Sequence, residues 1–156
     1  MNTAIKELME LVETFSEELR AIPEAEFSAK PLPHKWSKKE VLGHLADSGH
    51  NNLRRFISGQ HESTPPKIIY DQDAWVKSNN YQNETQVATI ELWKMINMRI
   101  VAVLAAMPKA HYAKACDTGR EQVQLHSLEW LASDYVKHMK HHLNQIIPGS
   151  FDVTYP

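Results

Sequence analysis

The segment SDYVKHMKHHLNQ, residues 133–145, lies near the end of a 156-residue chain and carries two histidines four positions apart, His138 and His142. On an α-helix, residues with this spacing lie one turn apart on the same face. Two imidazoles placed in this way can bind one metal ion if another element supplies further ligands. A histidine-rich helix could also carry such a pair without binding metal, so the segment predicts a helix and leaves the site open.

The residues around this pair define the predicted helix. Ser127 is a suitable N-cap, and Pro148-Gly149 ends the pattern, which gives a helix from about Leu128 to Ile147. The apolar residues recur at helical spacing: Leu128, Ala132, Tyr135, Met139, Leu143 and Ile146. His138 and His142 border this stripe, where a metal could meet the core and still be open to water or substrate.

The same periodicity predicts two helices in the first third of the chain. The first covers residues 3–20, with Thr3 as its cap, and Pro23 ends it. The second begins at Ser37, which forms a capping box with Glu40. Its apolar pattern continues to Gly59, which we expect to stop the helix.

A third long helix is predicted over residues 83–107, with Asn83 as its cap and Pro108 as its end. Its apolar surface is broad enough to serve two interfaces, so a homodimer through this helix is one expectation. Residues 60–82 form a long connection in which Asp71 or Asp73 starts a short helical turn that places Trp75 against the bundle. Residues 108–126 read as a polar connection, and residues 67–70 and 151–155 as short β-prone pieces.

These patterns together predict an all-α four-helix bundle of up-down helices, with a long connection between helices 2 and 3. We expect residues 1–156 to form a single domain, because a chain of this length can bury its own core.

The composition excludes several classes of protein. The formal net charge is −2 and the pI is near 6.5, without a basic stripe, which argues against nucleic-acid binding. No stretch approaches 18 apolar residues, and the N-terminus does not read as a signal peptide, so we expect no membrane contact and a cytoplasmic protein. The one cysteine, Cys116, excludes an internal disulfide and has no motif partner, so we interpret it as an ordinary small side chain.

A catalytic metal site of the zinc type needs a third protein ligand and an open position. The spacing does not choose among several carboxylates and four histidines, His44, His50, His111 and His126. His44 points away from the apolar stripe of its own helix, so the helical pattern predicts that it faces solvent. The same prediction applies to His34 and His50.

Three segments of the chain resemble the DinB/YfiT-like superfamily. Residues 35–48, KWSKKEVLGHLADS, are similar to the start of the family's second helix, where Trp-Ser/Thr precedes an apolar run and then His-Leu/Val-Ala-Asp. Residues 70–75 resemble a segment that follows this helix, and residues 138–146 resemble the last-helix pattern His-x-x-His-His-x-x-x-Ile. Their order and spacing agree over essentially the whole chain. One departure is Gly49-His50, because relatives often show His sooner after Asp-Ser.

The resemblance implies a frequently dimeric four-helix bundle that holds one divalent metal ion, nickel or zinc. Carried over position by position, the metal ligands are His44, His138 and His142. The implied activity is that of an enzyme acting on a small-molecule substrate, either a metal-dependent hydrolase that activates water or a thiol S-transferase that uses bacillithiol, mycothiol or glutathione. No side chain is assigned as catalytic. From their positions in the sequence, Asp134, Gln145 and Asn51 are candidates to hydrogen-bond to the metal ligands and orient them.

Two other functions remain open from the sequence. The same site could belong to a non-catalytic stress protein that binds a metal or a small molecule. A bundle with paired histidines could also bind haem through two axial imidazoles.

Overall fold

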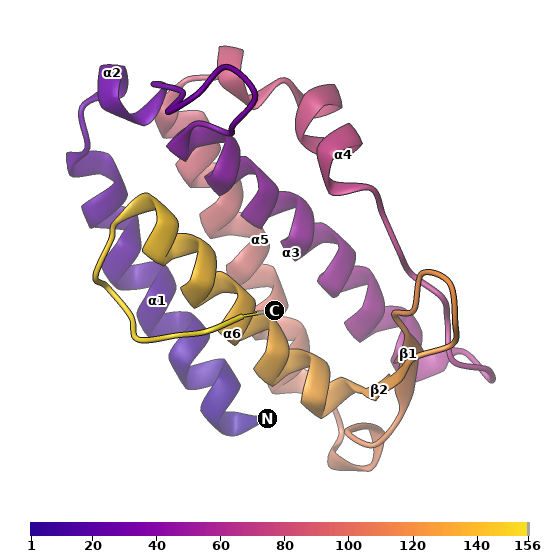
Figure 1. Ribbon diagram of the computed structural model, residues 1–156. Helices are drawn as coiled ribbons and strands as arrows, with labels where there is room; N and C mark the ends of the chain where they lie inside the picture. The colour runs from indigo at the N-terminus through magenta and orange to yellow at the C-terminus, as the bar shows by residue number, and fades with distance from the viewer. Residues whose placement is uncertain (156) are drawn as a thin grey trace.

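The computed structural model describes residues 1–155 and shows a bundle of four long helices (Figure 1). These helices are α1 (Asn2–Ala21), α3 (Lys38–His61), α5 (Gln86–Ala106) and α6 (Leu128–Ile146). The predicted all-α four-helix bundle is therefore confirmed. Among the described residues, no helix has the length and apolar character needed to cross a membrane.

Short elements occupy the connections between the long helices. They are α2 (Glu24–Phe27), α4 (Gln72–Asn79), the 3-10 turns η1 (Tyr81–Asn83) and η2 (Lys109–His111), and the strands β1 (Ala115–Asp117) and β2 (Leu125–Ser127). The two strands pair antiparallel, with Cys116 opposite His126. This hairpin lies in the segment predicted only as a polar connection. The β-prone segment 67–70 contributes an isolated bridge from Lys67 to Asp117.

The long connection between α3 and α5 returns the chain to the end of the bundle where α3 begins (Figure 1). There, the Gln86 amide at the start of α5 donates to the carbonyls of Leu19 and Ile22, at 2.6 and 2.8 Å. Nearby, Lys39 at the start of α3 donates to the Glu84 carbonyl at 2.7 Å. The two helices therefore run in the same direction, and α3 packs against both α5 and α6. The predicted up-down order thus fails between these two helices, because the long connection spans the length of the bundle before α5 begins.

Helix caps explain why several elements begin where they do. The predicted capping box is present, because Ser37 Oγ accepts from the Glu40 N–H at 3.2 Å and the Ser37 N–H donates to Glu40 Oε2 at 2.8 Å. Ser127 caps α6 and Asp71 caps α4, also as predicted. The third helix starts later than predicted, with Thr85 as its cap, because Asn83 belongs to η1.

Three other sequence predictions were wrong in detail. Thr3 lies inside α1, which begins at Asn2 without a side-chain cap. Gly59 does not stop α3, and instead allows close packing: a Cβ atom there would lie 2.7 Å from Leu128 Cδ2 and 2.9 Å from Cys116 Sγ. In α4 it is Val76, 3% exposed, that is buried, while Trp75 is partly exposed.

The lone cysteine is completely buried beneath the end of α3. Burial raises the pKa of the Cys116 thiol to about 11. Its interpretation as a packed small side chain agrees with this position.

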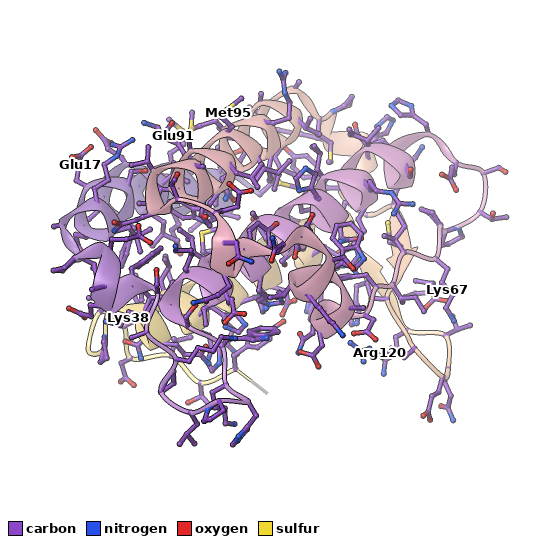
Figure 2. The ribbon with its side chains drawn as sticks, turned by 90° about the horizontal axis from the view of Figure 1, so that it is seen from above. Glu17, Lys38, Lys67, Glu91, Met95 and Arg120 are labelled. Atoms are coloured by element: carbon purple, nitrogen blue, oxygen red, sulfur yellow. The ribbon has the colours of Figure 1, made fainter. Side chains whose placement is uncertain are left out.

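On the outer side of α5, several apolar side chains lie on the surface. Met95 is 70% exposed, and it lies beside Glu91 in Figure 2. Three other apolar residues of this helix are also exposed: Val87, Leu92 and Met98. The apolar surface of α5 is therefore broader than the part that packs into the bundle core.

Candidate metal site

The second turn of α3 places His44 in the interior. Its side chain was predicted to face solvent, but the residue is only 1% exposed. The prediction was wrong because α6 and Trp36 cover this side of α3. The Trp36 ring, which directly precedes the capping box, lies with its centroid 5.2 Å from that of His44.

Helix α6 presents His138 and His142 on one side, one turn apart. Residues on the neighbouring stripe, Tyr135, Met139 and Leu143, are buried in the core, which fixes the rotation of the helix. Both histidines are partly buried at the edge of this stripe, as the sequence indicated.

The three histidines from α3 and α6 converge. One ring nitrogen from each of His44, His138 and His142 lies within 4.8 Å of those of the other two. The Nε2 atoms of His44 and His138 are 3.3 Å apart. Metal–nitrogen bonds of about 2.0–2.1 Å at a tetrahedral angle separate two ligand atoms by about 3.3–3.4 Å, so this spacing fits a shared metal ion.

Hydrogen bonds at the opposite ring nitrogens orient two of these imidazoles. His142 Nδ1 lies 2.9 Å from Gln145 Oε1, and His138 Nδ1 lies 3.5 Å from Ser48 Oγ. If Nδ1 carries the proton, Nε2 is free to bind a metal in both cases. His44 Nδ1 is buried and has no hydrogen-bond partner among the described residues.

The environment keeps all three imidazoles neutral. Burial, together with the neighbouring His142, lowers the pKa of His44 to about 3. Burial and the adjacent histidines lower the pKa of His138 to about 2, and burial also lowers the pKa of His142. The neutral form is the one that binds metals, so the unprotonated set is ready at neutral pH.

The three candidates for orienting the ligands have different surroundings. Gln145 contacts His142 and also places its Nε2 2.9 Å from His141 Nε2. Asp134 instead accepts from the Tyr155 hydroxyl at 3.0 Å, and Asn51 donates to the Asp47 carbonyl at 2.9 Å. Within residues 1–155, Gln145 is therefore the one of these three residues that hydrogen-bonds to a clustered histidine.

The remaining histidines considered from the sequence lie elsewhere. His50 is exposed and contacts the Ala46 carbonyl, and His34 is also exposed. His111 contacts Gln60 at 3.3 Å, and the ring of His126 stacks on that of Trp130. Over the described part of the chain, the three-histidine group is the only cluster of His, Cys, Asp or Glu with metal-ligand spacing.

Two groups beside the site were not singled out from the sequence. Ser48 follows His44 by one helical turn and lies 3.5 Å from His138 Nδ1. It is the last residue of the family motif at residues 35–48, so its position beside His44 could have been inferred from the sequence. Asp47 is 1% exposed, and its Oδ1 accepts from the Tyr81 hydroxyl at 2.7 Å and from the Asn79 amide at 2.8 Å. It ties α4 and η1 to α3 beside the histidines.

The fold and the site define a class of protein: a helical bundle with a three-histidine cluster suited to a divalent metal. Residues 5–146 match the DinB superfamily, and the chain belongs to this family. The resemblance stated from the sequence motifs is thereby confirmed.

Named relatives agree with this assignment. "Putative metal-dependent hydrolase YfiT" of Bacillus subtilis is 26% identical over 111 residues, which are 71% of this chain and 62% of that protein. A protein of Geobacillus thermodenitrificans with a similar description is 26% identical over 113 residues, 72% of this chain. The chain thus spans about 62% of the length of these relatives.

Solved structures show the same fold. YfiT from Bacillus subtilis superposes with a TM-score of 0.83 at 22% identity, covering 93% of this chain and 82% of that one. A mycothiol-dependent maleylpyruvate isomerase superposes with a TM-score of 0.71 at 11% identity, covering 98% of this chain and 62% of that one.

Proposed function

We propose that this protein is a metal-dependent enzyme that activates water or a low-molecular-weight thiol at His44, His138 and His142. The observation that carries the proposal is the convergence of three neutral imidazoles from two helices. When bound, a divalent metal in such a site supplies a Lewis acid that lowers the pKa of a coordinated water or thiol.

The chain's own residues do the remaining work. His44, His138 and His142 would hold the metal through nitrogen atoms, a donor set that suits zinc and nickel. Gln145 and Ser48 orient two of the rings, and Trp36 covers His44. The burial of His44 excludes water from the inner side of the site, which leaves the α6 side for substrate.

Two reactions are compatible with this arrangement. Hydrolysis is supported by the descriptions of the curated relatives as metal-dependent hydrolases. Thiol chemistry is supported by the shared fold with a mycothiol-dependent isomerase. We place the substrate among small molecules and the protein in the cytoplasm.

Metal analysis of protein purified without an affinity tag tests the site. We expect stoichiometric zinc or nickel in the wild type and its loss in His44→Ala, His138→Ala and His142→Ala. His141→Ala is the matched control, because His141 lies on the same helix outside the cluster, and it should retain the metal. Unchanged metal content in the three ligand variants would contradict the proposal.

Turnover assays separate the enzyme from the alternative of a non-catalytic metal-binding stress protein. The metal-loaded protein is tested on esters and amides, and on electrophiles together with several low-molecular-weight thiols. Metal-dependent turnover that disappears in His138→Ala supports the enzyme. Stoichiometric metal without turnover of any of these substrates supports the binding protein.

A further inference from the structure

A large cleft lies beside the three-histidine cluster, between the loop that precedes α3, the start of α4 and the end of α6. Its volume is about 920 Å³, which is within the range of sites for small molecules. Its walls include five apolar residues: Ala29, Pro31, Leu32, Trp36 and Val41. In Figure 2, Lys38, which also lines the cleft, lies at the end of the molecule far from Lys67 and Arg120.

Two residues of the cleft wall also contact the clustered histidines. Trp36 packs on His44 with 5.2 Å between ring centroids, and Gln145 Oε1 lies 2.9 Å from His142 Nδ1. A molecule in the cleft would therefore lie against the two side chains that pack on His44 and His142, while none of the three clustered histidines lines the cleft itself. This continuity points to a binding site for part of the substrate.

Two of the three lysines that line the cleft form ion pairs within the protein. Lys30 forms an ion pair with Glu40 at 2.8 Å, and Lys38 forms one with Glu26 at 2.6 Å. Lys35 and Asp73, which also line the cleft, carry opposite charges. The lining therefore does not require a charged ligand. Its apolar residues are the part of the wall that a ligand would cover.

The loop that carries these apolar residues is held in place by hydrogen bonds. The Gln82 amide donates to the Ser28 carbonyl at 2.8 Å, and the Lys35 N–H donates to the Leu32 carbonyl at 2.9 Å. Even so, Leu32 is 51% exposed. An apolar side chain held in solvent at the edge of a preformed cleft gains most from a ligand that covers it.

We propose that this cleft binds an apolar chain of the substrate, whose reactive group extends past Trp36 and Gln145 to the histidine cluster. The ligand class is a small molecule with an extended uncharged hydrocarbon portion. This inference rests on the proposed function for its role, but the binding of the hydrocarbon does not require the metal. The two can therefore fail separately.

The experiment uses ethanol, butan-1-ol and hexan-1-ol as probes, because they differ only in chain length. Each is titrated into the full chain, with and without zinc, while backbone amide shifts are followed by NMR. Burial of one methylene group is worth about a fourfold change in affinity when it is complete. We expect the affinity to rise about two- to fourfold per methylene group, with shifts centred on residues 29–41 in both forms.

Leu32→Asp should abolish most of this dependence on chain length. Val123→Asp is the matched control: Val123 is an apolar residue with 71% exposure in the β1–β2 connection, which also carries Arg120, and it should behave like the wild type. An affinity that does not change with chain length would overturn the proposal. Amide shifts centred on the groove between α1 and α5 beside Met9 would also overturn it. If the wild-type protein binds hexan-1-ol but no zinc, the result contradicts the proposed function and leaves the proposed cleft site in place.

Discussion

Gln145 is in contact with two histidines at once, so its side chain should tune the metal site. Its Oε1 lies 2.9 Å from His142 Nδ1 and favours the tautomer whose Nε2 binds metal. We expect Gln145→Ala to weaken zinc affinity about 10-fold or more, the range typical for such outer residues. Competition with a chelator of known affinity measures this change.

Asp134→Asn is the comparison for Gln145→Ala. Asp134 accepts a hydrogen bond from Tyr155 and not from a clustered histidine. We expect zinc affinity in Asp134→Asn to stay within about threefold of the wild type, below the effect of removing a direct partner. A larger loss in Asp134→Asn than in Gln145→Ala would reverse these assigned roles.

The buried carboxyl of Asp47 should make stability depend on pH. Burial raises its pKa to about 6 in the folded protein, above the unfolded value of 3.8. The folded state therefore binds more protons in this window, and stability falls as pH rises from about 4 to above 6. Asp47→Asn keeps an acceptor for Tyr81 and Asn79 but removes this titration.

We therefore expect Asp47→Asn to gain stability relative to the wild type as pH rises through this window, by up to about 3 kcal/mol. Urea unfolding of both metal-free proteins at several pH values measures the difference. The histidines titrate in both proteins, so their contribution cancels. A constant difference across the window would show that Asp47 titrates normally.

His44 shows how far single residues could be predicted from sequence. His44 lies away from the apolar stripe of α3, so its spacing indicated a surface position. The pattern of a single helix shows where its own apolar stripe lies, and it does not show which other elements cover its remaining sides. The side that looked exposed is covered by Trp36, 8 positions before His44, and by α6, whose His138 lies 94 positions after it. Only the family motif recruited His44, whereas the His138–His142 pair was visible from its own helix.

At the scale of elements, the contact between α3 and η1 depends on Gly43. A Cβ atom at this position would lie 2.1 Å from Tyr81 Cδ2. We expect Gly43→Ala to lower the free energy of unfolding by about 1–3 kcal/mol through overpacking. This loss should occur although Ala is favoured over Gly inside a helix by about 1 kcal/mol. Chemical denaturation provides the measurement.

A double-mutant cycle identifies the cause. With Tyr81→Ala in the background, the overlapping ring is absent, so Gly43→Ala should become neutral or stabilising. If Gly43→Ala lowers the free energy of unfolding equally in that background, overlap with the Tyr81 ring does not explain the loss of stability.

The long helices and their caps were predictable because their signals are local. Ser37 with Glu40, Ser127 and Asp71 all form the caps that their sequence positions predicted. The β1–β2 hairpin was not, because its pairing is stabilised by packing of Cys116 under α3 and not by a strand pattern. Asn83 was mistaken for a cap because Thr85, two residues later, offers the same chemistry.

For the whole molecule, the exposed face of α5 bears on the homodimer expected from the sequence. An antiparallel pairing of two copies about Met95 would place Glu91 opposite Arg99 and Leu92 opposite Met98, since each pair is equally spaced from residue 95. The face is therefore complementary to itself in apolar surface and in charge, with Glu91 also paired to Arg20 of its own chain. We propose that a second copy of the chain covers it.

Light scattering combined with gel filtration tests this assembly. We expect a dimer for the wild type and a monomer for Met95→Glu, which places a charge at the centre of the contact. Arg99→Glu should weaken the dimer, and Glu91→Arg combined with Arg99→Glu should restore it. A monomeric wild type would contradict the proposal.

Under the proposed thiol chemistry, the burial of Cys116 has a further consequence. A thiol with a raised pKa and no access to solvent is a poor nucleophile, so the folded chain offers no thiolate of its own for alkylation. An electrophile at the histidine cluster would then compete with no cysteine thiolate from the described residues, because Cys116 is buried under α3.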